Sequence, residues 1–176
     1  TAAEVVDIDY NDNSNIGELK RLGEFPDVKK CVKITSAPGA FADSPQQSFY
    51  MDADKLYELS AWVKAEDLNE DKDEEPSPDY IEAIIARNGG ESYTCHGRVA
   101  VSDGKWHHIK AVLSYSKADA ENGFTGNSLM FLRYSANNGN VYGSAPDVKK
   151  TFYVAEFSVK ELENVVSNPY YIVSSG

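Results

Sequence analysis

The stretch at residues 57–64, YELSAWVK, constrains the fold more than any other part of the chain. Its residues alternate between apolar and polar, which is the period of a strand with one face on the core. Trp62 breaks the pattern, because it falls on the polar side together with two charged residues and a serine. A large aromatic in such a position is either covered by another element or used for binding.

Further segments alternate in the same way, and turn formers separate them. Asp103-Gly104, for example, is a hairpin signal between two of them. No segment of ten or more residues has helical periodicity. We therefore predict an all-β fold, a two-sheet antiparallel β-sandwich (jelly roll). The expected strands are residues 5–10, 31–35, 46–51, 57–64, 80–87, 92–101, 106–115, 128–135 and 152–159.

The length of 176 residues fits one domain, which we place at residues 1–164, with residues 165–176 as a last strand or the start of a linker. The formal net charge of −11 disfavours polyanionic partners, so neither nucleic acid nor an anionic membrane surface is expected. No long apolar run that could span a bilayer is present. The chain begins with Thr1 and shows no signal peptide, and we expect that a leader or a preceding domain was removed or lies outside this sequence.

Two features leave alternatives open. Residues 65–79 are rich in Asp and Glu and contain two prolines, which is typical of a solvated loop. A calcium site there is the alternative, although the spacing does not match an EF-hand. Cys31 and Cys95 each fall in an expected strand, so they form either a disulfide or two buried thiols. Two cysteines do not supply a zinc-ligand spacing.

Sequence motifs of enzymes are absent. The chain has no Gly-x-Ser-x-Gly, no phosphate-binding loop and no His-Glu-x-x-His. His107 and His108 are neighbours that would point to opposite faces of a strand, so the two cannot hold one ion together. The abundant carboxylates leave a glycosidase pair open, but nothing specific indicates catalysis.

The sequence indicates binding more clearly than catalysis. Sugar rings pack their C–H faces on flat aromatic side chains, and their hydroxyls need polar donors and acceptors beside these rings. The chain carries many aromatic residues and several arginines in or near its expected strands. They are Phe41, Tyr50, Trp62, Tyr93, Tyr134 and Tyr142, with Arg87, Arg98 and Arg133.

Three motifs resemble those of carbohydrate-binding modules of families 4, 9 and 22. Residues 57–64 resemble their Y-x-L-S-x-W-V-K strand, residues 101–109 (VSDGKWHHI) resemble V-x-x-G-x-W-x-x-L, and residues 152–159 (FYVAEFSV) resemble the closing F-Y-V-D-D-V-x-L strand. The motifs fall in the family order across about residues 28–162. This resemblance implies a jelly roll, non-catalytic and usually appended to a secreted glycanase, that binds single xylan or β-glucan chains in a cleft on the concave sheet.

The resemblance also suggests which residues contact the sugar. Phe41 lies where family 22 modules have a W-x-G-P stretch with a stacking Trp, and Tyr93 lies near their second stacking aromatic. The Glu of their Y-x-E motif falls near Ser135, so that hydrogen-bonding role is lost or moved. We predict that Tyr93 and Trp62 stack on the sugar.

Arg98 is predicted to support these two aromatics. The spacing from Tyr93 to Arg98 is odd, so a regular strand would put them on opposite faces, and only a bulge, for which Gly97 is suited, lets both serve one cleft. Phe41, Tyr134 and Tyr142 are the next candidates for the ligand-binding site.

In the same families the closing Asp often helps to hold a structural calcium ion with acids from the first strand. The first Asp of that motif is Ala155 here, which leaves Glu156 with Asp7 or Asp9 as the candidate calcium ligands. Oxygen ligands favour calcium over zinc or copper.

The resulting hypothesis is a monomeric, secreted, extracellular module that brings an attached glycanase to a plant cell-wall polysaccharide such as xylan, β-glucan or xyloglucan. The alternatives are a spacer or interaction jelly roll of a multidomain cell-surface protein, and a jelly-roll lyase or hydrolase.

Overall fold

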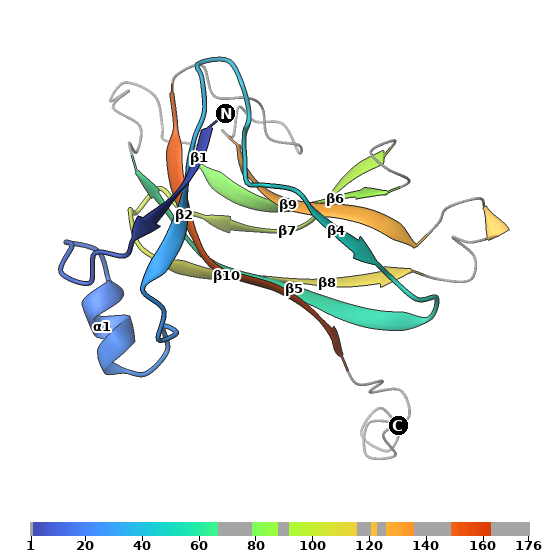
Figure 1. Ribbon diagram of the computed structural model, residues 1–176, viewed down its shortest axis with the longest axis horizontal. Helices are drawn as coiled ribbons and strands as arrows, with labels where there is room; N and C mark the ends of the chain where they lie inside the picture. Colours follow the sequence, from blue (N-terminus) through green and yellow to red (C-terminus); the bar gives the residue numbers. More distant parts are fainter. Residues whose placement is uncertain are drawn as a thin grey trace.

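The computed structural model describes residues 2–66, 79–87, 92–115, 121–122, 126–135 and 149–162. Two antiparallel sheets lie face to face, as predicted (Figure 1). The first sheet has the strand order β1-β2-β10-β5-β8; the second has the order β3-β9-β6-β7, with β4 also paired to β9. The strands are β1 (Ala2–Asp7), β2 (Lys30–Thr35), β3 (Ala42–Asp43), β4 (Gln47–Tyr50), β5 (Lys55–Glu66), β6 (Tyr80–Arg87), β7 (Ser92–Ala100), β8 (His107–Tyr115), β9 (Asn127–Ser135) and β10 (Thr151–Leu162).

The main core lies between the two sheets. Leu59, Ala61 and Val63 of β5 are fully buried, which confirms that the alternating stretch turns its apolar side inward. They belong to one hydrophobic cluster with Ile81 of β6 and Leu132 of β9. Each strand of this kind therefore leaves its other residues on an outer face of the sandwich.

A second hydrophobic cluster covers part of the outer face of the first sheet. A short helix, α1 (Ile16–Arg21), lies outside this sheet (Figure 1), and its buried Ile16 packs with Phe25, Trp62 and Trp106. The helix was not predicted, because six residues are too few to show a helical period. The cluster closes one end of this face to solvent.

The two cysteines lie on opposite outer faces of the sandwich. Cys31 belongs to the cluster on the first sheet, whereas Cys95 packs against Ile84 and Phe131 on the second. Both thiols are free, so the disulfide is excluded and the alternative of two thiols is confirmed. Burial raises the pKa of Cys31 to about 11.

Some sequence predictions fall on residues 67–78, 136–148 and 163–176, which lie outside the described residues. They include Tyr142, most of the acidic stretch and the boundary at residue 164. Asp79, taken as the end of that solvated stretch, is in fact buried and forms an ion pair with the buried Lys150, with 3.6 Å from Nζ to Oδ2. No helix within the described ranges is long and apolar enough to cross a membrane.

Candidate functional site

A row of charged side chains runs across the outer face of the second sheet. The strand register pairs Asp43 of β3 with Arg133 of β9, Arg133 with Glu82 of β6, and Glu82 with Arg98 of β7. The charges alternate in sign along the row. Cross-strand neighbours of opposite charge stabilise one another, so four strands together hold a fixed array of polar groups on one face.

Arg133 is the most firmly placed residue of this row. Its Nε and one terminal nitrogen donate to the two carboxylate oxygens of Asp43, at 2.8 and 2.9 Å. Its guanidinium carbon lies 4.0 Å from the centroid of the Phe41 ring, a cation–π contact. Bidentate pairing and stacking fix the plane of the guanidinium, so its position does not depend on a ligand.

Glu82 places a carboxylate at the centre of the row. It is only 5% exposed, and Ser135 Oγ donates a 2.8 Å hydrogen bond to Glu82 Oε1. Sequence reasoning did not select Glu82 as a site residue, although it is the one acid within the apolar segment YIEAIIA at residues 80–86. The hydrogen-bonding role of the glutamate expected near Ser135 was predicted to be lost or moved. A glutamate carboxylate does lie beside Ser135, but it comes from the neighbouring strand β6.

Arg98 ends the row on β7. Its side chain is exposed, and its guanidinium carbon lies 4.3 Å from the centroid of the Tyr80 ring. A bulge interrupts the pairing of β6 with β7, between the pairs that Ala83 makes with Gly97 and Ile84 makes with Cys95. The bulge that a shared cleft would require is therefore present next to Gly97, with His96 as the extra residue.

Because of this bulge, positions 93 and 98 share one face of β7. Position 93 pairs with Ala86, and position 98 pairs with Glu82; two residues of β6 separated by four positions lie on the same side of the strand. The side chain of Tyr93 lies outside what the structure describes, but the register supports the prediction that both positions serve one face.

Apolar residues continue this face beside the charged row. Ile84, Ala86 and Phe131 form a buried cluster there, and a cavity of about 350 Å³ follows at β4 and β9, lined by Tyr50 and Leu129 among others. Tyr50 is 62% exposed. Flat rings and apolar side chains thus flank the polar row.

Two predicted ligand-binding residues are not available to a ligand. Trp62 lies on the outer face of the first sheet and is 8% exposed, because Phe25 packs on it at 5.2 Å between ring centroids and His108 stacks on it at 4.7 Å. Tyr134 is fully buried between the sheets, and its hydroxyl donates to Asp79 Oδ2. The prediction that Trp62 stacks on a sugar is therefore wrong, and Tyr134 is not a ligand-binding residue either.

The structure does not bring the predicted calcium ligands together. The Asp7 carboxylate forms an ion pair with Lys30, Asp9 Oδ1 accepts a 2.9 Å hydrogen bond from the Asn11 amide, and Glu156 lies at a bulge of β10. Within the described ranges, no three His, Cys, Asp or Glu side chains gather as a metal site. Structural calcium stays a prediction.

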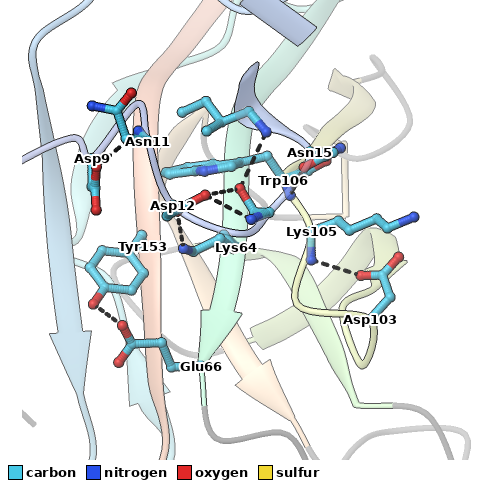
Figure 2. A network of polar contacts seen from close by, with 12 residues as sticks. Asp9, Asn11, Asp12, Asn15, Lys64, Glu66, Asp103, Lys105, Trp106 and Tyr153 are labelled. Atoms are coloured by element: carbon cyan, nitrogen blue, oxygen red, sulfur yellow. Dashed lines mark hydrogen bonds and ion pairs between the residues drawn. The ribbon is translucent and has the colours of Figure 1, made fainter. Parts of the chain in front are cut away.

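Asp12, which follows the first strand, forms an ion pair with the ammonium group of Lys64. Lys64 Nζ lies 2.7 Å from Asp12 Oδ2, at the centre of the polar network in Figure 2. Burial raises the pKa of Asp12, but hydrogen bonds from Lys64 and from Ser14 more than offset it, so this pKa lies below its ordinary value. The Lys64 ammonium also lies 5.9 Å from the Trp106 ring and 5.3 Å from the Tyr153 ring.

Comparison with known proteins decides the type of fold. No protein-family model matches the sequence, and no protein of curated function matches it. Among solved structures, the CBM22-1 xylan-binding domain of Xyn10C from Paenibacillus barcinonensis has a TM-score of 0.53 at 16% identity, over 92% of this chain and 83% of that one. This chain shares its β-sandwich fold with that family 22 carbohydrate-binding module.

Two further structures show how widely this fold is used. The tandem CBM22-1–CBM22-2 domain of the same protein, Xyn10C, has a TM-score of 0.56 at 16% identity, over 93% of this chain and 40% of that one. The enzymatically active domain of tailspike protein 4 from bacteriophage CBA120 has a TM-score of 0.50 at 8% identity, over 92% of this chain and 18% of that one. At such identities the likeness shows a shared fold, and function has to be argued from the site.

Proposed function

We propose that this protein is a non-catalytic carbohydrate-binding module that binds a neutral plant cell-wall β-glycan on the outer face of the second sheet. The observation that carries the proposal is the charged row on that face, in which the exposed Arg98 and the half-buried Arg133 can reach a ligand and the nearly buried Glu82 carboxylate lies between them. Xylan is the first ligand to test, because it is the ligand in the name of the structural neighbour with the same fold.

The chemistry of the row suits sugar hydroxyls. A carboxylate accepts and a guanidinium donates, and hydrogen bonds to charged groups are stronger than those between neutral groups. Arg133 is already fixed by Asp43 and Phe41, so little conformational entropy is lost when a ligand binds. The exposed Tyr50 on β4 supplies an aromatic ring at one end of this face on which a sugar ring can pack.

The wider setting belongs to the same proposal. A module of this kind is secreted, acts as a monomer and keeps an attached glycanase close to its polysaccharide. The net charge of −11 fits an uncharged ligand better than a polyanion.

The test is affinity electrophoresis and calorimetric titration with xylan, xyloglucan and mixed-linkage β-glucan. Arg98→Met should weaken binding about tenfold or more, from the loss of one charge-assisted hydrogen bond. Glu82→Gln should weaken it as well, because it removes the negative charge that lies between Arg98 and Arg133 in the row. Lys110→Met is the matched control, because Lys110 is an exposed lysine of β8 in the other sheet and should bind like the parent. Binding of none of the glycans would reject the proposal in favour of a spacer jelly roll.

A further inference from the structure

The outer face of the first sheet contains a cavity that the proposed function does not use. Its volume is about 350 Å³, within the lower range of small-ligand sites. It lies over β2, β10 and β5 and is bordered by the segment between β1 and α1. Its lining includes Lys33, Lys64, Glu66, Tyr153, Trp106 and Asp12, several of which Figure 2 shows around Lys64.

Trp106 presents a hydrogen-bond donor that the protein does not use. The residue is only 4% exposed, and its indole Nε1 donates to no acceptor among the described residues. Its backbone is fixed by Asn15, whose Oδ1 accepts from Trp106 N at 2.7 Å and whose Nδ2 donates to Trp106 O at 3.0 Å. A buried donor without an acceptor is costly. Because the nitrogen itself is buried although the ring lines the cavity, a ligand there supplies the acceptor only when the side chains that cover Nε1 shift.

The remaining polar groups offer both donors and acceptors. The register places Lys33, Tyr153 and Lys64 in one row across β2, β10 and β5. Lys64 is paired with Asp12, and the Tyr153 hydroxyl donates to Glu66 Oε1. Lys33 has no carboxylate partner in the described part of the chain, so its ammonium is a second donor that a ligand can engage.

The charges of the cavity select against ionic ligands. Four carboxylates line it against two ammonium groups, so an anion is repelled. A simple cation has no acceptor for the Trp106 indole and the Lys33 ammonium. A neutral ligand rich in hydroxyls both donates and accepts, and the rings of Trp106 and Tyr153, with centroids 6.5 Å apart, give it an apolar surface. The lining carboxylates are Asp7, Asp9, Asp12 and Glu66.

We infer that this cavity is a second binding site, for a single uncharged sugar residue. It lies on the opposite side of the sandwich from the charged row of Glu82 and Arg98, so the two sites are occupied independently. A protein with both sites can hold a polysaccharide on one face and a free sugar, or the end of another chain, on the other.

The test follows the indole N–H of Trp106, which has to be assigned separately from that of Trp62 in the same cluster. In ¹⁵N-labelled protein with assigned spectra, the Trp106 indole N–H signal should move and saturate on titration with xylose or glucose up to about 100 mM, since so small a ligand binds at about millimolar Kd. Glucuronate is the anionic probe of similar size and should not move it. Glu82→Gln and Arg98→Met should leave this titration unchanged, which separates the site from the proposed glycan face.

Variants of the cavity complete the test. Lys33→Met should raise the Kd for the neutral sugar about tenfold or more by removing one charged donor, and Lys110→Met should leave it unchanged. Tyr153→Phe, which keeps the ring, is a second variant in case Lys33→Met does not fold, and a rise in its Kd is likewise expected. An immobile Trp106 signal with both neutral sugars, equal binding of glucuronate, or an unchanged Kd in the cavity variants would overturn the inference.

Discussion

The ion pair of Lys64 with Asp12 gives a sharp prediction about stability. Asp12→Asn removes the charge but keeps Oδ1, which accepts a 2.8 Å hydrogen bond from the Ser14 amide. The side chains of Lys64 and Asp12 are only 15% and 20% exposed, so the lysine would be left largely out of water without its partner. We expect a loss of about 2 kcal/mol in the free energy of unfolding, between an exposed pair and a fully buried one.

The pH dependence of this loss follows from the pKa of Asp12. The folded protein holds that pKa below its ordinary value, which in the unfolded chain is about 3.9. The stabilisation is therefore fully present above about pH 4 and is lost as the pH falls through the lower folded pKa. Parent and variant should differ most at neutral pH and converge in acid.

Urea unfolding of both proteins across this pH range measures the difference. Lys30→Met is the control, because its pair with Asp7 is largely exposed and should contribute less than about 1 kcal/mol. Lys64→Met, alone and combined with Asp12→Asn, completes a double-mutant cycle that isolates the coupling. A loss no larger than that of the control, or one that persists unchanged in acid, would refute the reasoning.

Three further predictions concern the buried groups and the metal. Tyr134→Phe should cost about 1–3 kcal/mol in chemical denaturation, because it leaves the buried Asp79 without its hydroxyl donor; an unchanged stability would contradict this. Thiol titration should find two free thiols after unfolding, and a reducing agent should not change the melting temperature. A melting temperature that falls when the reducing agent is added would show a disulfide. Calcium added to chelator-treated protein tests the predicted metal site: a higher melting temperature supports it, whereas an unchanged value rejects it.

The sandwich could be predicted from the sequence because apolar and polar residues alternate along β5, and this alternation directly indicates which residues are buried. The same alternation does not say what covers an outer face. Trp62 lies on the polar side of its strand, as read, but Phe25 and the buried Ile16 of α1 close over it. These partners lie tens of residues away in a segment without a clear period, so no local pattern announced them.

Tyr134 shows the opposite difficulty. The segment at residues 128–135, SLMFLRYS, is apolar on both sides of the strand, and its pattern therefore does not tell the inner face from the outer. The structure turns Met130, Leu132 and Tyr134 inward and leaves Phe131 and Arg133 on the outer face. The predicted ligand-binding residues Tyr134 and Arg98 consequently lie on different faces of the second sheet.

Glu82 marks the limit of reading a site along the chain. The Y-x-E motif of the similar families predicts a glutamate near Ser135, and the segment at residues 128–135 does not contain one. In the sandwich, Ser135 Oγ donates to a carboxylate 53 residues earlier in the chain, and β6 and β9 are adjacent strands. A sugar hydroxyl can donate a hydrogen bond to a carboxylate at a given position, whichever strand carries that carboxylate. The row from Asp43 to Arg98 can therefore keep the chemistry of a glycan-binding face although its motif is broken.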